Sequence, residues 1–87
     1  MKNNIKRKSL RSFYLAAFLY CKGYSLVSIE YNSTKRADFI FEGNNSMDEL
    51  IDKFNFAEKQ DEEILVDVRE FVMAVKMLKD KLYQGRP

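Results

Sequence analysis

Residues 13–21, which read Phe-Tyr-Leu-Ala-Ala-Phe-Leu-Tyr-Cys, form the longest apolar run in this chain of 87 residues. As a helix the run rises only about 14 Å, half of the ~30 Å hydrocarbon layer of a membrane, so it cannot span a bilayer. Several cations and no acid precede it, which resembles the start of an export signal, but no small-x-small cleavage site follows. We therefore expect a buried first helix in a cytoplasmic protein without a membrane anchor.

Apolar residues continue the helical spacing just before this run. Leu10 and Ala17 lie seven residues apart on one face of the predicted helix. Ser9 has a hydroxyl typical of an N-cap, and Gly23 stands where a left-handed residue commonly ends a helix. The first helix is therefore predicted over about residues 10–22. Because it is apolar on most sides, we expect it to lie deep against a sheet.

The next segment alternates apolar and polar residues in the manner of a β-hairpin over about residues 25–42. Residues 32–35, Asn-Ser-Thr-Lys, supply the turn between the two strands. Strand side chains change faces with period two, so one face of the hairpin can be apolar throughout. The predicted apolar face consists of Val27, Ile29, Tyr31, Phe39 and Phe41.

A second helix is predicted over about residues 47–56. Ser46 followed three residues later by Glu49 has the form of a capping box, in which two backbone N–H groups are satisfied reciprocally. An acidic loop over residues 57–63 follows, and Ile-Leu-Val at 64–66 predicts a short third strand at the edge of the hairpin.

The third helix is predicted from an N-cap at Asp67 to Tyr83, with Gly85 as its stop. Met73 and Met77 lie i, i+4 at the border of its apolar stripe. They are interpreted as core filler in preference to a flexible edge that binds a partner.

These elements predict an α+β fold in which a two- or three-stranded antiparallel sheet is packed by the N-terminal and C-terminal helices. The composition, 46% hydrophobic with three Gly and one Pro, suits one globular domain. We expect residues 1–9 to form a basic N-terminal arm and residues 10–84 to form that single domain.

Composition also excludes much enzyme chemistry. The chain has no His and a single Cys, so it cannot contain a disulfide framework, a Cys/His zinc site or a His-based catalytic triad. Cys21 lies in the apolar run, where a free thiol is more typical of packing than of nucleophilic attack. Asp48 and Asp52 share a helix face, but no loop has EF-hand spacing. We expect no catalytic residue, metal, cofactor or small-molecule substrate.

Five segments together resemble a known family. They are residues 14–19 (YLAAFL), 22–24 (KGY), 39–42 (FIFE), 66–71 (VDVREF) and 78–80 (LKD). With them the chain resembles the uncharacterised small proteins of phages, prophages and related Gram-positive elements grouped as domain of unknown function 5659. The resemblance covers about residues 10–83. It implies a compact α+β fold and an origin in a mobile element, and it assigns no catalytic residues.

Charge is segregated along the chain, because residues 1–22 carry a net charge of +6 and residues 44–70 carry −6. A basic surface could bind the phosphates of a nucleic acid, with a steep dependence on salt. The alternative is that these cations only keep a small protein soluble. The fold order resembles a double-stranded-RNA-binding domain, but Asp67 and Glu70 stand where that fold places lysines. The candidate nucleic-acid-binding residues are Lys6, Arg7, Lys8, Arg11, Lys76 and Lys79.

A second hypothesis is a protein-binding module. It would act as a homodimer or as an inhibitor of a host or defence factor, through the exposed edge of the sheet or through an acidic surface that imitates a phosphate backbone. The candidate residues of that surface are Asp48, Asp52, Asp61, Glu62 and Glu63.

Overall fold

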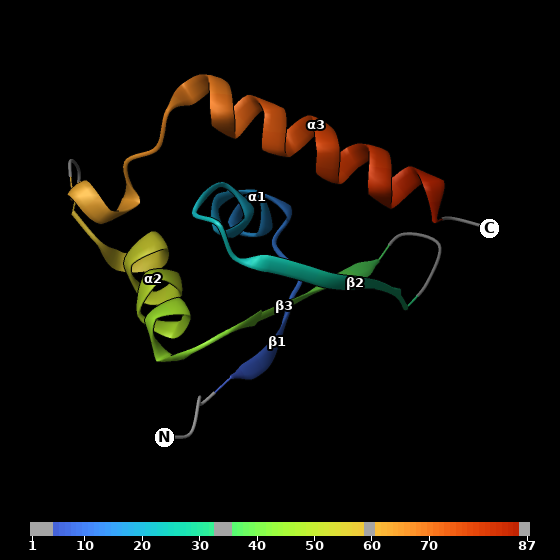
Figure 1. Ribbon diagram of the computed structural model, residues 1–87, viewed down its shortest axis with the longest axis horizontal. Helices are drawn as coiled ribbons and strands as arrows, with labels where there is room; N and C mark the ends of the chain where they lie inside the picture. Colours follow the sequence, from blue (N-terminus) through green and yellow to red (C-terminus); the bar gives the residue numbers. More distant parts are fainter. Residues whose placement is uncertain (1–4, 33–35, 59–60, 86–87) are drawn as a thin grey trace.

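The computed structural model describes residues 5–32, 36–58 and 61–85. The elements, in chain order, are β1 (Lys6–Leu10), α1 (Phe13–Cys21), β2 (Ser25–Tyr31), β3 (Ala37–Gly43), α2 (Asn45–Phe56), the 3-10 turn η1 (Glu62–Ile64) and α3 (Val68–Gln84). A three-stranded antiparallel sheet with three helices confirms the predicted α+β class (Figure 1).

The sheet has the order β1-β3-β2, so the two predicted strands of the hairpin pair and the second of them is central. Residues 33–35 of the predicted turn lie outside the described residues. The third strand is β1, which lies before the hairpin in sequence. The prediction of a strand over 64–66 is wrong, because Ile64 ends η1 and the following two residues form no strand. Likewise, residues 6–9 belong to the sheet and do not form an arm outside the domain.

The strand β1 escaped prediction because it does not alternate apolar and polar residues. Lys8 lies opposite Phe41 and Leu10 lies opposite Phe39, so the inward side of β1 has one buried residue at its end. Three consecutive cations make it a charged edge strand, a feature that discourages pairing with other chains.

The helix α1 begins three residues later than predicted. Leu10 is the last residue of β1, so Ser9 cannot be its N-cap; instead the Ser12 hydroxyl accepts a hydrogen bond from the Leu15 N–H at 3.2 Å. Residues 15–19 are all buried, which confirms the interior position of the apolar run. Gly23 has φ 97°, in the left-handed region that the sequence predicted there.

The strand β2 contains a register shift between Leu26 and Ser28. As a consequence Leu26 and Ile29 pack against the core, whereas Val27 is 39% exposed. The expectation that Val27 belongs to the apolar face is therefore wrong. A bulge inserts an extra residue, which shifts the alternation of side chains by one position.

The predicted caps of α3 are confirmed, but the predicted N-cap of α2 is wrong. Asn44, not Ser46, is the N-cap of α2, and its side chain accepts from the Ser46 N–H at 3.0 Å. Asp67 caps α3 by accepting from the N–H groups of the second and third residues after it, and Gly85 ends that helix, as predicted. The Tyr31 hydroxyl donates to the Leu82 carbonyl at 2.7 Å, which ties β2 to the last turn of α3.

The helix α1 lies between the sheet and α3 (Figure 1). It is seen end-on while α3 runs across the view, so the two helices cross. The helix α2 closes one side of the same core, where Met47 is fully buried. The core is therefore organised around α1.

The central position of α1 can be tested with matched leucine substitutions. Leu19 is 0% exposed, so Leu19→Ala removes packing atoms and leaves a cavity. We expect it to lower the free energy of unfolding by about 2–5 kcal/mol in urea titrations. Leu65→Ala, at a residue 56% exposed, is the control and should change stability by less than about 0.5 kcal/mol. Equal effects of the two substitutions would contradict this arrangement.

Candidate functional site

Two of the predicted nucleic-acid-binding cations are paired with a predicted protein-binding acid. The Lys8 Nζ lies 3.0 Å from Asp48 Oδ1, and the Lys6 Nζ lies 3.8 Å from Asp48 Oδ2. Both lysines are on β1, and Asp48 is in the first turn of α2, where a carboxylate also suits the helix dipole. These residues hold an edge strand to a helix.

Arg7 and Arg11 also face acids of the same domain. The Arg7 Nε lies 3.5 Å from Glu42 and the Arg11 Nε lies 3.8 Å from Asp38, and both acids belong to the central strand β3. These pairs are exposed on the cation side, so they stabilise the fold little. They nevertheless give each of the four N-terminal cations an acidic neighbour.

Lys76 and Lys79 lie on α3, away from the other predicted cations. Both are exposed, and neither has an ion pair within the described ranges 5–32, 36–58 and 61–85. The strand β1 is at the opposite end of the molecule from α3 (Figure 1). The six predicted cations therefore do not form one basic surface.

The predicted acidic surface is partly neutralised as well. Lys53 on α2 lies 3.8 Å from Asp61 and 2.5 Å from Glu63. The hydrogen bond that Lys53 donates to Glu63, together with the nearby carboxylates, raises the pKa of Lys53. Asp52 and Glu62 are exposed and have no ion pair among the described residues.

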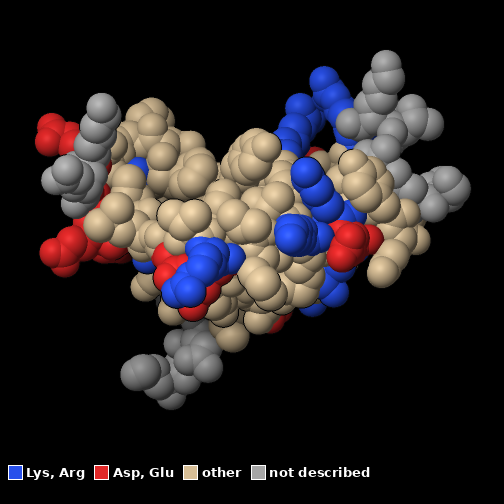
Figure 2. Space-filling view, turned by 90° about the horizontal axis from the view of Figure 1, so that it is seen from above, with Lys and Arg blue, Asp and Glu red and all other residues tan. Residues whose placement is uncertain are grey.

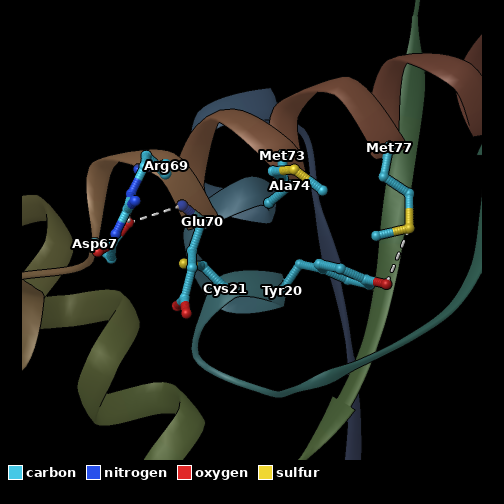
Figure 3. Close-up of a pocket in the computed structure, with 8 residues that line it drawn as sticks. All are labelled: Tyr20, Cys21, Asp67, Arg69, Glu70, Met73, Ala74 and Met77. Atoms are coloured by element: carbon cyan, nitrogen blue, oxygen red, sulfur yellow. Dashed lines mark hydrogen bonds and ion pairs between the residues drawn. The ribbon is translucent and has the colours of Figure 1, made fainter.

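A different site lies where α3 crosses the C-terminal end of α1. It is a groove of about 660 Å³. The lining residues come from these two helices and from the residue that caps α3 (Figure 3). We call it the α1–α3 groove; it is lined by Tyr20, Cys21, Asp67, Arg69, Glu70, Met73, Ala74 and Met77.

The middle of the α1–α3 groove is apolar and rich in sulfur. The Tyr20 hydroxyl donates to the Met77 Sδ at 3.1 Å, which fixes the tyrosine ring as one wall. Ala74 is buried between the helices. Met73, by contrast, is 68% exposed, so its interpretation as core filler is wrong.

One end of the α1–α3 groove is acidic. Glu70 extends towards Cys21, while Arg69 lies beside Asp67 at 3.7 Å (Figure 3). Burial raises the pKa of the Cys21 thiol, and Glu70 and Asp67 raise it further, so this thiol is a poor nucleophile. Seen from the side of α3, acidic residues gather at the end near η1 and most cations near the C-terminal end of α3 (Figure 2).

Further exposed apolar residues lie close to the lining residues of α3 in the sequence. Leu65, Val68 and Val72 are all exposed and lie next to the groove in sequence. The signal that could have located the site was the i, i+4 pair Met73 and Met77. In the sequence, Tyr20, Cys21 and Ala74 are equally typical of a core, and Asp67 and Glu70 are equally typical of a helix start.

Within residues 5–32, 36–58 and 61–85, no group of three or more His, Cys, Asp or Glu side chains could hold a metal ion. None of the helices described is long and apolar enough to cross a membrane.

Comparison with known proteins identifies the family alone. A family model described as Domain of unknown function (DUF5659) matches residues 3–84, which confirms the resemblance found in the sequence. Neither a curated protein nor a solved structure shows a significant match. The function must therefore be argued from the geometry.

The pairing of Asp48 with β1 predicts a pH dependence. The hydrogen bond from Lys8, and the charges of Lys8 and Lys6, lower the pKa of Asp48. A carboxyl whose pKa is depressed by folding stabilises the protein above its unfolded-state pKa of about 3.9, and this contribution is lost as the pH falls through the folded-state value. Asp48→Asn should therefore be less stable than the natural protein at pH 7, and the difference should vanish in strong acid.

Urea titrations at pH 7 and in strong acid measure this difference. Asp52→Asn is the matched control, one turn later on α2 and without an ion pair in the described residues; it should leave stability nearly unchanged at both pH values. A deficit of Asp48→Asn that persisted undiminished in strong acid would show that the ion pair is not its cause.

Proposed function

We propose that this chain, which belongs to the DUF5659 family, is a non-enzymatic module that binds another protein through the α1–α3 groove. The observation that carries the proposal is the exposure of Met73 over an apolar hollow, although every other methionine in the described residues is half-buried or fully buried. Methionine is flexible and polarisable, and it is common on surfaces that adapt to a protein partner.

The surroundings of the groove support this reading. Leu65, Val68 and Val72 are also exposed near the start of α3, and exposed apolar surface on a small protein is typical of an interaction site. The groove offers no chemistry for catalysis, since it combines a thiol of raised pKa with carboxylates and contains no histidine. A binding role therefore suits it better than an enzymatic one.

The proposed role belongs in the cytoplasm of a cell that carries a phage, prophage or related element. A host protein, such as a defence factor, is the partner class we favour. The proposal moves the binding surface from the predicted acids of residues 48–63 to α3, because Asp48, Asp61 and Glu63 already pair with lysines of this chain.

Purification from the cells that encode the protein tests this function. Met73→Glu places a charge over the apolar hollow, and we expect it to abolish capture of a partner that survives nuclease treatment. Tyr14→Glu is the control, at a residue 60% exposed in the first turn of α1, at the other end from the groove. It should retain the partner. Loss of the partner from both variants, or from neither, would count against the groove.

Nucleic-acid binding remains a second candidate because of one observation. Lys76, Lys79 and Lys81 stand exposed along the C-terminal half of α3, a stretch of basic surface that could contact phosphates (Figure 2). We favour it less, since the four N-terminal cations have acidic neighbours and lie on the opposite side of the molecule.

Titration of labelled duplex DNA and single-stranded RNA at several salt concentrations distinguishes the two candidates. We expect only weak binding, micromolar or poorer at physiological salt. The variant with both Lys76→Ala and Lys79→Ala should lower the slope of log affinity against log salt by about two units. The slope should fall less in a variant with alanine at all four N-terminal cations, Lys6, Arg7, Lys8 and Arg11. Tight binding that depends on those four residues would instead favour nucleic acid as the partner.

A further inference from the structure

We propose that the occupant of the α1–α3 groove is a basic amphipathic helix of the partner, placed with its apolar face on the methionines and a lysine or arginine beside Glu70. The inference rests on the protein-binding function proposed above and specifies the chemistry of the partner.

The dimensions of the groove suit a helix. Its lining on α3 runs from Asp67 to Met77, about 15 Å along the helix axis. That length matches about three turns of a second helix packed alongside. A helix bound in a groove contacts it through residues at i, i+3, i+4 and i+7. In this groove those residues would meet the apolar middle, which is formed by Tyr20, Met73 and Met77.

The charge of the groove selects a basic partner. Asp67 accepts hydrogen bonds from the first turn of α3 and is paired with Arg69, so its charge is compensated within the chain. The Glu70 carboxylate has neither an ion pair nor a side-chain hydrogen bond among the described residues, and it points over Cys21. Glu70 is therefore the uncompensated charge at the acidic end of an apolar groove.

The electrostatic effect of these acids on Cys21, at the bottom of the groove, is consistent with a basic partner. Burial is the main cause of the raised pKa of Cys21; the negative charges of Glu70 and Asp67 raise it further, and Lys22 lowers it. A cation on the partner would lie in the same field. An acidic helix would instead place like charges together at the point where the contact excludes water.

The methionines provide a direct readout of occupancy. The protein labelled with 13C at its methionine methyl groups is titrated with a synthetic amphipathic helical peptide of leucine and lysine, and with the same peptide carrying glutamate in place of lysine. We expect the Leu/Lys peptide to shift the methyl signals of Met73 and Met77. The signal of Met47, which is fully buried on α2, should stay in place and show that the fold is intact.

A charge variant tests the assigned contact. Glu70→Gln keeps the size of the side chain and should weaken binding of the Leu/Lys peptide about threefold, the range of one exposed ion pair. Glu49→Gln, on the exposed side of α2, is the matched control and should leave the affinity unchanged. Equal affinities for the natural protein and Glu70→Gln would overturn the role of Glu70.

The remaining outcomes separate this inference from the function on which it rests. If the Leu/Glu peptide shifts Met73 and Met77 as strongly, the groove binds protein but the inferred chemistry of the partner is wrong. If these signals move on concentration without any peptide, a second copy of the chain occupies the groove, which also overturns the inference. If neither peptide moves them, the inference fails, and the capture experiment with Met73→Glu judges the function independently.

Discussion

The fold depends on the enclosure of one short helix. Residues 15–19 of α1 are all buried, so this helix has no side that can face water along its middle. A helix that is apolar all round requires partners on every side. The sheet, α3 and α2 each cover a different side of α1 (Figure 1). Ala16, Ala17 and Ala74 belong to the same core cluster and are small enough for the helices to pack closely.

The groove is a geometric consequence of this enclosure. The helix α3 has 17 residues and α1 has nine, and because the helices cross, α1 can support α3 over only part of its length. Ala74 and Leu78 face the core and are buried, whereas Val68 and Met73 of the same helix are exposed. Tyr20 and Cys21, at the end of α1, line the groove although they belong to the apolar run.

Local signals in the sequence predicted what depends on local physics. The period of two located the hairpin, and Asp67 and Gly23 marked helix ends because caps act through the nearest backbone groups. The strand β1 could not be found in this way, since an edge strand of cations buries little and is defined by its pairing with β3. The bulge at Val27 and the exposure of Met73 likewise depend on neighbours that are distant in sequence.

The charge pattern shows why a candidate site read from linear sequence can mislead. By sequence alone the basic start of the chain and the acidic middle suggest two surfaces for two kinds of partner, but Lys8 and Asp48 are forty residues apart in sequence and 3.0 Å apart in space. Segregated charges of opposite sign can attract within one chain as readily as between chains. What remains for a partner is the charge that the fold leaves uncompensated, and in the α1–α3 groove that charge is Glu70.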